Sequence, residues 1–284
     1  MNLCPICSSD ASLKYPLTYE VYQCKKCDFQ FAPNARFNTS LVSDLDESSR
    51  IKALKNLRML NFERIMASLK KYITPSNTGL EIGCGHGWFL EACKATQIKC
   101  IGIEPETHFN DLHKSIGVEV LNGFFPDVLP SNTQYDFIAY NDVFEHLPDV
   151  KAMMKTNNAL LNKNGKLIIN LPIQGGITYF ISGLAYHFGV KTLINRMWQF
   201  NFHSPHFSYF SKKNLTELAE SADFKLIDLF ALKTINISEI KDRVNQDKNS
   251  NIISRYISIA GAFALYPFMQ LFPDTYCFVF EKNN

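Results

Sequence analysis

The stretch GLEIGCGHGWFLEA, residues 79–92, decides the expected fold. A short apolar run leads into three glycines, Gly83, Gly85 and Gly87, and a helical pattern follows them. Glycines at the end of a strand let the backbone approach a ligand closely, and the start of the next helix offers unpaired N–H groups. A dinucleotide fingerprint requires G-x-G-x-x-G, but Trp88 stands at the third glycine position. The spacing therefore argues against NAD.

Strands and helices alternate around this loop. Helical patterns are expected at about residues 86–96, 106–116, 149–162 and 211–222, and a further helix from Ser48 to about Ile73. This alternation predicts an α/β protein with a doubly wound sheet. The expected strands are Gly79–Gly83, Lys99–Ile103, Val118–Leu121, Tyr135–Asn141, Lys166–Leu171, Lys225–Ala231 and Tyr276–Glu281.

The pattern hh[D/E]hGxGxG in the loop resembles motif I of class I methyltransferases that depend on S-adenosylmethionine (SAM). KCIGIEPE (99–106) supplies an acid at the next strand end, and YDFIAYNDVFEHLPD (135–149) is similar to the segment after strand 4 in methyltransferases of quinones and sugars. LNKNGKLIINLP (161–172) resembles the lead into their fifth strand. The resemblance implies a Rossmann-like sheet of seven strands with helices on both faces, and an enzyme that transfers a methyl group.

The resemblance also implies a SAM site. The three glycines would cradle the methionine part, and Glu81 would help to hold its amino end. An acid at a strand end can accept two hydrogen bonds from a ribose diol, which is the role implied for Glu104. The family often carries Gly-Asp after strand 3, where this chain has Asn122-Gly123, so backbone is expected to meet the adenine there. The expected cofactor-binding residues are Glu81, Gly83, Gly85, Gly87, Glu104, Gly123, Phe124 and Asn141.

Glu145 and His146 are the candidate catalytic residues, because they follow strand 4 at the expected mouth of the sheet. Methyl transfer from a sulfonium needs orientation, and a base where the nucleophile is weak. In sugar C-methyltransferases with a similar Glu-His pair the histidine is implicated as the base, although their nearby tyrosine is Val143 here. The alternative is that His146 caps the next helix or orders the loop.

WQFNFHSPHFSYFS (198–211) places His203 and His206 among aromatic residues. Related methyltransferases often carry a His-x-x-x-Phe-Ser-type segment here that folds over the acceptor. The segment therefore predicts aromatic side chains that line the acceptor site and histidines that hydrogen-bond to the substrate. The alternative is that the aromatic residues pack in the core and the histidines bond to other protein groups. No carboxylate or cysteine is near in the sequence, so no metal is expected at these two histidines.

Two Cys-x-x-Cys pairs open the chain, as CPIC and CKKC. Four thiolates at this spacing predict a closed, structural zinc site. The expected organisation is a zinc-ribbon-like module at 1–36, a linker with a helical extension at 37–74, and a methyltransferase domain at 75–284. Aromatic residues of the module are expected to pack onto that domain. The expected zinc ligands are Cys4, Cys7, Cys24 and Cys27.

Composition bounds the partners. The 284 residues are 46% hydrophobic with a formal net charge of only +2, which indicates a globular protein and disfavours nucleic acid as a partner. An RNA methyltransferase that docks through its zinc module has a similar layout and remains an alternative. Free cysteines, the metal site and a start without a signal pattern predict a cytoplasmic protein. The sequence leaves the oligomeric state open.

Two stretches, Leu167–Val190 and Tyr256–Pro273, contain no Lys, Arg, Asp or Glu. They are interrupted by glycine or proline and fall short of a membrane-spanning helix. They are expected to belong to buried cap insertions at about 173–210 and 232–273. The alternative is an interfacial patch that touches a membrane or a lipid-linked substrate. The leading acceptor is a nucleotide-linked sugar or another polysaccharide or secondary-metabolite intermediate, followed by a quinone- or lipid-linked one.

Overall fold

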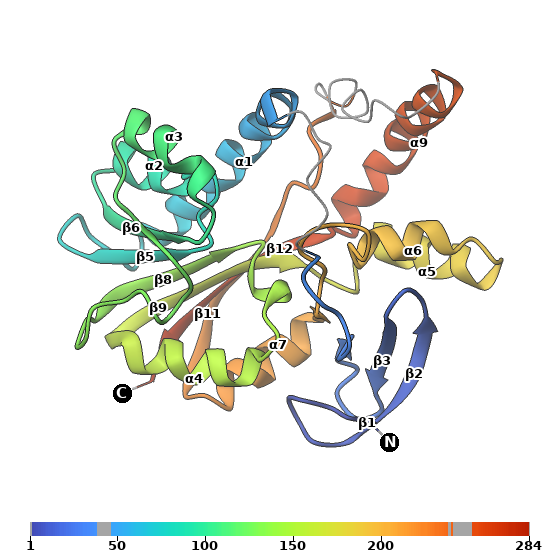
Figure 1. Cartoon of the computed structure of the whole chain (residues 1–284), viewed down its shortest axis with the longest axis horizontal. Helices are drawn as coiled ribbons and strands as arrows, with labels where there is room; N and C mark the ends of the chain where they lie inside the picture. Colours follow the sequence, from blue (N-terminus) through green and yellow to red (C-terminus); the bar gives the residue numbers. More distant parts are fainter. Residues whose placement is uncertain (1, 39–46, 238–239, 241–251, 284) are drawn as a thin grey trace.

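The computed structural model describes residues 2–38, 47–237, 240 and 252–283. Its main sheet has the strand order β11-β12-β9-β8-β5-β6-β7 (Figure 1). All neighbouring pairs are parallel except those of β12, which is antiparallel to both β9 and β11. The strands are β5 (Thr78–Ile82), β6 (Lys99–Glu104), β7 (Val120–Asn122), β8 (Tyr135–Asn141), β9 (Leu161–Pro172), β11 (Phe224–Leu232) and β12 (Thr275–Lys282).

The predicted seven-stranded sheet is confirmed. The bounds of β8 agree with the sequence pattern, β6 differs from it by one residue at one end, and β5, β11 and β12 differ by one residue at each end. β9 begins five residues earlier than expected, and its first two residues, 161 and 162, are strand where the pattern predicts the end of a helix. The chain leaves β5 toward β6 and returns to β8 on its other side, so the ends of β5 and β8 flank the point where the strand order reverses. Ligands bind at such a point in open α/β sheets.

Helices cover both faces of the sheet (Figure 1). On one face, α4 (Val150–Leu160) and α7 (Lys212–Glu220) bury Met154 and Leu215 against the sheet. On the other, α1 (Glu47–Leu69) and α2 (Trp88–Ala95) bury Ile65 and Phe89. The short η1 (Thr107–Phe109) and α3 (Asn110–Ile116) connect β6 to β7. The apolar side chains at helical spacing therefore produce two cores, one on each face.

The N-termini of α4 and α7 are capped by side chains. The carboxylate of Asp149 accepts a hydrogen bond from Ala152 N at 2.9 Å, and Ser211 forms a capping box with Asn214. Such caps satisfy N–H groups that the first turn leaves unpaired. The alternative that His146 caps α4 is therefore wrong, since Asp149 does so.

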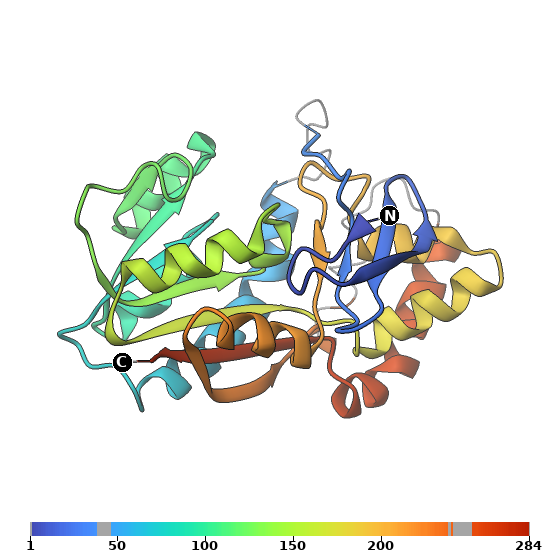
Figure 2. The ribbon, with the colours of Figure 1, turned by 90° about the horizontal axis from the view of Figure 1, so that it is seen from below.

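The N-terminal module is a small antiparallel sheet that the main domain extends. It contains β1 (Asn2–Leu3), β2 (Asp10–Pro16), β3 (Glu20–Cys24) and β4 (Gln30–Phe31), and its fifth strand is β10 (Ser208–Tyr209) from the segment after β9. Figure 2 shows the module in blue beside this part of the chain. The predicted aromatic packing is confirmed, with ring centroids 4.9 Å apart for Phe29 and Phe210 and 5.1 Å apart for Tyr19 and Phe200.

Three helices form the remaining segments: α5 (Ile177–His187), α6 (Lys191–Met197) and α9 (Ile252–Leu271). The prediction that these apolar stretches are buried is wrong for their outer sides, because Phe188 is 80% and Leu271 72% exposed. Sequence hydropathy reports how apolar a segment is and not what covers it. Among the helices that the structure describes, none is long and apolar enough to cross a membrane.

Candidate active site

The glycine loop adopts a conformation that side chains tolerate poorly. Gly83, Gly85 and Gly87 all have positive φ angles, of 67°, 48° and 74°. A Cβ atom at Gly83 would approach Val143 Cγ2 to 2.9 Å, whereas a Cβ at Gly85 would meet no atom within 4 Å. The loop is therefore packed against the segment after β8 at Gly83 and open at Gly85, as a ligand cradle requires.

Glu104 organises this loop from the end of β6. Its Oε2 accepts a hydrogen bond from Gly85 N at 2.8 Å, and its Oε1 accepts one from Glu106 N at 3.0 Å. Burial raises the pKa of Glu104, and the two backbone donors offset part of that effect. Each oxygen keeps a lone pair for a further donor. Glu104 therefore lies beside the loop, as the sequence predicted.

Glu81 lies inside the sheet at the end of β5. Its Oε1 accepts a hydrogen bond from Asn141 Nδ2 at 2.7 Å, whereas its Oε2 has no hydrogen-bond partner among the described residues. Burial raises the pKa of Glu81 to about 8, although the bond from Asn141 favours the ionised form. Asn141 in turn accepts a bond from Asn170 of β9. An unpartnered buried carboxyl oxygen is costly unless a ligand supplies a donor.

His113 was not identified from the sequence. Its Nε2 donates to the carbonyl oxygen of Gly85 at 2.6 Å from the buried side of α3. This bond fixes the orientation of the most open peptide in the glycine loop. A lone histidine in a short amphipathic helix carries no sequence signal for such a role.

Gly123 and Phe124 follow β7 near Glu104. The Gly123 N–H donates to the carbonyl of Glu104 at 3.2 Å, and the Phe124 side chain is 72% exposed. The Gly123 N–H thus has a protein partner, while the exposed Phe124 ring is free to cover a ligand. Both lie one strand beyond Glu104, in the order the sequence implied.

Glu145, His146 and His206 form a cluster at the carboxyl end of β8, where η2 (Phe144–His146) follows the strand. One polar atom from each of the three lies within 4.8 Å of the others, and Glu145 Oε1 is 4.0 Å from His206 Nε2. The imidazole centroids of His146 and His206 are 4.6 Å apart. Glu145 and His206 are only 1% and 3% exposed, whereas His146 keeps some exposure.

The hydrogen bonds of His146 fix its tautomer. Its Nδ1 lies 2.9 Å from the carbonyl oxygen of Pro205, which can only accept, so Nδ1 carries the hydrogen and Nε2 the lone pair. Burial lowers the pKa of His146 to about 4, and the Pro205 carbonyl offsets part of this shift. Burial also lowers the pKa of His206 well below its usual value. Both imidazoles are therefore neutral at physiological pH.

Glu145 has the opposite character. Burial raises its pKa to about 8, with partial compensation from its own backbone N–H and from the charge of Arg58. Its Oε2 has no hydrogen-bond partner in the described part of the chain. The cluster thus combines a protonated carboxyl group with a neutral imidazole whose Nε2 can accept a proton. Titratable neighbours with pKa values moved apart are typical of acid–base sites.

The structure separates the two histidines of residues 198–211. His206 joins the cluster, but the His203 side chain is exposed, and the His203 carbonyl accepts a hydrogen bond from Asn38 N at 2.9 Å. The sequence places no carboxylate near these histidines, and for that reason no metal was expected there. That premise is wrong for His206, since folding brings the Glu145 carboxylate close to it. Glu145 and His206 are 61 positions apart in the chain, so the spacing of residues in the sequence does not reveal that they meet.

The four N-terminal cysteines converge as predicted. Their Sγ atoms lie within 4.8 Å of one another, with Cys7 3.4 Å from Cys24 and 3.5 Å from Cys27. Tetrahedral zinc with Zn–S bonds of about 2.3 Å places sulfurs about 3.8 Å apart. The N–H groups of Lys26 and Cys27 both point to Cys24 Sγ at 3.4 Å. The donor set and spacing fit a closed four-sulfur site.

The cysteine module is tied to the loop that carries His206. β4 pairs with β10, and Ala32 N donates to the carbonyl of Phe207 at 2.9 Å. The amide of Asn214, in α7, donates to the carbonyl of Cys27 at 3.1 Å. The same loop also bonds to the segment after β8, where Phe207 N donates to the carbonyl of Glu145 at 2.9 Å. The module therefore holds the His206 loop against Glu145.

A family model described as a methyltransferase domain matches residues 53–229, which is more than half of the chain. The chain belongs to this methyltransferase family. The resemblance seen in the glycine loop is thereby confirmed, and so is the Rossmann-like fold. The match begins within α1 and ends in β11, so it includes the glycine loop, Glu104 and the Glu145–His146–His206 cluster.

Individual relatives of this methyltransferase-family chain are distant. C-methyltransferase NovU of Streptomyces niveus is 23% identical over 225 residues, which are 76% of this chain and 48% of NovU. The chain thus spans about half the length of that relative. The ubiquinone biosynthesis O-methyltransferase of Coxiella burnetii is 24% identical over 185 residues, 62% of this chain and 75% of that protein. A cyclopropane synthase of Mycobacterium tuberculosis superposes with a TM-score of 0.57 at 16% identity, over 78% and 83% of the two chains, which shows the fold alone.

Proposed function

We propose that this protein transfers a methyl group from SAM to a carbon atom of a small-molecule acceptor, with a nucleotide-linked sugar as the acceptor class. The buried Glu145–His146–His206 cluster beside the glycine loop carries the proposal. The similarity to C-methyltransferase NovU supports carbon as the methylated atom. The Glu-His segment and the cysteine module, which together resemble sugar C-methyltransferases, support the acceptor class.

SAM fits the residues at the ends of β5 and β6. The open backbone at Gly85 offers a close approach, and Oε2 of Glu81 is a buried acceptor that no described protein group satisfies. Glu81 would hold the amino group, Glu104 the ribose, and the segment at Gly123 and Phe124 the adenine. Asn141 would position Glu81. When bound, SAM supplies an activated methyl group on a sulfonium, and the chain supplies orientation and a base.

Replacing Glu104 with Ala should weaken SAM binding about tenfold to a hundredfold, because it removes charge-assisted acceptors and frees Gly85 N–H from its partner. Titration calorimetry with SAM measures the effect. Glu119→Ala, which removes an exposed acid directly before β7, is the matched control and should bind SAM normally. Equal affinity of both variants and the wild type would remove Glu104 from the cofactor site.

SAM binding should depend on pH through Glu81. Because the pKa of Glu81 is raised to about 8, its carboxyl is protonated at pH 7 without SAM, and a cationic amino group would favour the ionised form. Binding then releases a proton, so affinity falls by up to about tenfold for each pH unit below 8. Calorimetry at pH 6, 7 and 8 measures the slope. Glu81→Gln should bind more weakly and lose the slope, and an unchanged slope in that variant would contradict the assignment.

The cluster suits proton removal from carbon next to a carbonyl group. His146 Nε2 takes the proton, since its Nδ1 is held by Pro205 O. The protonated carboxyl of Glu145 donates a hydrogen bond to the oxygen on which negative charge develops. His206 completes the buried wall beside Glu145. The resulting carbon nucleophile would accept the methyl group of bound SAM as the bond from sulfur to that methyl breaks, leaving S-adenosylhomocysteine.

A hydroxyl acceptor is the second candidate, because the same histidine can deprotonate an oxygen and a ubiquinone O-methyltransferase is similar over 62% of this chain. The RNA alternative has only the cysteine module in its favour, and the net charge of +2 opposes it. We also propose that the cysteine module holds structural zinc, since four sulfurs leave no open position for catalysis.

An acceptor panel with methyl-labelled SAM tests the proposal. Nucleoside-diphosphate-linked keto sugars should become labelled on carbon, whereas catechol-type quinone precursors and total RNA should not. Nuclear magnetic resonance of the product distinguishes a C-methyl from an O-methyl group. Labelling of the quinone precursors alone would replace the proposed acceptor class, and labelling of RNA alone would overturn the small-molecule assignment.

A further inference from the structure

The exposed side of α9 is apolar. In a helix at the surface of a globular protein the exposed residues are normally polar. Here the exposed positions recur every three or four residues along one stripe, and Gln270 is the one polar residue beside it among the described positions of the helix. The stripe consists of Tyr256, Ala260, Phe263, Ala264, Pro267, Phe268 and Leu271.

A second apolar stripe lies on the neighbouring helices α5 and α6. Phe180 and Leu184 are exposed one helical turn apart, and Phe188, Val190 and Leu193 continue the exposed row. α5 and α9 are in contact, and Ile177 N donates to the carbonyl of Phe272 at 3.2 Å. Figures 1 and 2 both show α9 (red) beside α5 and α6 (yellow). We call these two stripes the apolar face; it holds nine of the sixteen large hydrophobic side chains that are exposed among the described residues.

The charged residues within the two stretches that carry the apolar face are all basic. Asp and Glu make up 27 of the 284 residues, yet none occurs in 167–216 or in 252–273. These stretches contain five basic residues, Lys191, Arg196, Lys212, Lys213 and Arg255. A second copy of the chain would bring these cations together with no acid in either stretch to pair with them. Anionic lipid headgroups complement such cations.

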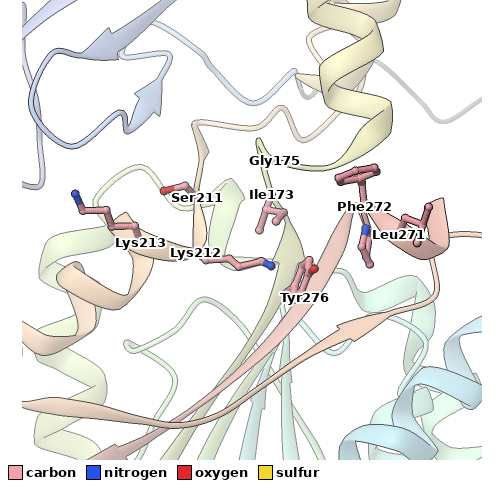
Figure 3. Close-up of a pocket in the computed structure, with 9 residues that line it drawn as sticks. Ile173, Gly175, Ser211, Lys212, Lys213, Leu271, Phe272 and Tyr276 are labelled. Atoms are coloured by element: carbon pink, nitrogen blue, oxygen red, sulfur yellow. The ribbon is translucent and has the colours of Figure 1, made fainter. Parts of the chain in front are cut away.

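A pocket of about 360 Å³ lies where this face meets the sheet (Figure 3). Leu271, Phe272 and Tyr276 form its apolar side, and Lys212 lies with Nζ 3.7 Å from the centre of the Tyr276 ring. Figure 3 shows Lys212 pointing toward Tyr276, with Ser211 at the start of α7. The pocket combines apolar walls with a cation. It therefore complements an anionic lipid headgroup and the methylene groups next to it.

The pocket opens at the same end of the sheet as the Glu145 cluster. Ile173 and Gly175, which line it, directly follow β9, and β9 is the neighbour of β8. The apolar face therefore lies at the edge of the molecule where the strand ends gather.

From these observations we infer that the apolar face docks on an anionic lipid bilayer. The two exposed stripes of the apolar face enter the interface, and the five basic residues pair with the headgroups. The docked protein would bring the carboxyl ends of its strands close to the membrane surface. This inference does not depend on which acceptor the cluster serves.

Vesicle sedimentation tests the inference with the full chain. Wild-type protein should sediment with phosphatidylcholine vesicles that contain about one third phosphatidylglycerol, and much less with phosphatidylcholine alone. The double variant Phe263→Ser and Phe268→Ser should bind at least about tenfold more weakly. Lys191→Glu with Arg196→Glu should remove the preference for anionic vesicles. The matched control, Leu13→Ser with Leu60→Ser, changes two exposed apolar residues elsewhere and should bind like the wild type.

SAM affinity and melting temperature, unchanged in each variant, verify that the variants are folded. Two outcomes would overturn the inference. One is wild-type protein that stays in solution with both kinds of vesicle while sedimentation velocity shows a dimer that the phenylalanine variant dissociates. The other is vesicle binding that the control pair and the phenylalanine pair reduce equally.

Discussion

Replacing His146 with Ala should lower turnover by about 10²- to 10⁴-fold, the usual contribution of a general base. The neutral imidazole presents Nε2 because Pro205 O holds Nδ1, and the low pKa of about 4 keeps it unprotonated at working pH. SAM affinity should stay within about twofold, since His146 is not among the residues proposed to hold SAM. Initial rates at saturating SAM and calorimetry measure the two effects separately.

His146→Gln should be as inactive as His146→Ala, because it keeps a polar side chain but cannot accept the proton. His187→Ala, which removes an exposed histidine on α5, is the matched control and should be fully active. The base role has a signature besides turnover: with S-adenosylhomocysteine in place of SAM, wild-type enzyme should exchange the acidic C–H of the acceptor with deuterated water. An alanine variant that exchanges and methylates at the wild-type rate would show that His146 is not the base.

Cys24→Ser should remove the metal and inactivate the enzyme. Cys24 receives two backbone N–H groups, and its loss leaves three ligands for zinc. Because β4 pairs with β10 and the His206 loop bonds to the carbonyl of Glu145, loosening the module should release that loop. We expect a fall of about 10 °C in melting temperature and at least a hundredfold loss of turnover. Metal content by atomic emission, calorimetry and initial rates measure these effects.

Cys100→Ser is the matched control, since Cys100 lies outside the module, in β6, and is only partly buried. It should retain zinc and activity. SAM affinity distinguishes release of the His206 loop from unfolding of the whole protein. The affinity should persist in Cys24→Ser at temperatures below its melting point. A metal-free Cys24→Ser protein that methylates at the wild-type rate would show that the cysteine module is not needed to hold the His206 loop in place.

The features predicted correctly from the sequence are local patterns. The seven strands follow from apolar runs between helical segments, and the glycine loop follows from three glycines directly after β5. The cysteine cluster follows from two pairs whose spacing suits one metal. In each case the residues that matter are close in the chain or obey a fixed spacing.

The features missed are contacts between distant residues. Glu145 Oε1 lies 4.0 Å from His206 Nε2 although the two residues are 61 positions apart, and His113 reaches Gly85 across 28 residues. Arg58 of α1 forms an ion pair with Asp142 directly after β8, across 84 residues of the chain. The exposed apolar side of α9 was expected only as the alternative to a buried cap, since composition does not show which side of a helix is covered.

The most direct test of the central claim is to incubate the protein with methyl-labelled SAM and a metabolite extract, and to follow the label by mass spectrometry. We expect the label in a low-mass product that the wild type forms and His146→Ala does not. Label confined to the RNA fraction, or no transfer to any product by protein that binds SAM, would contradict the account.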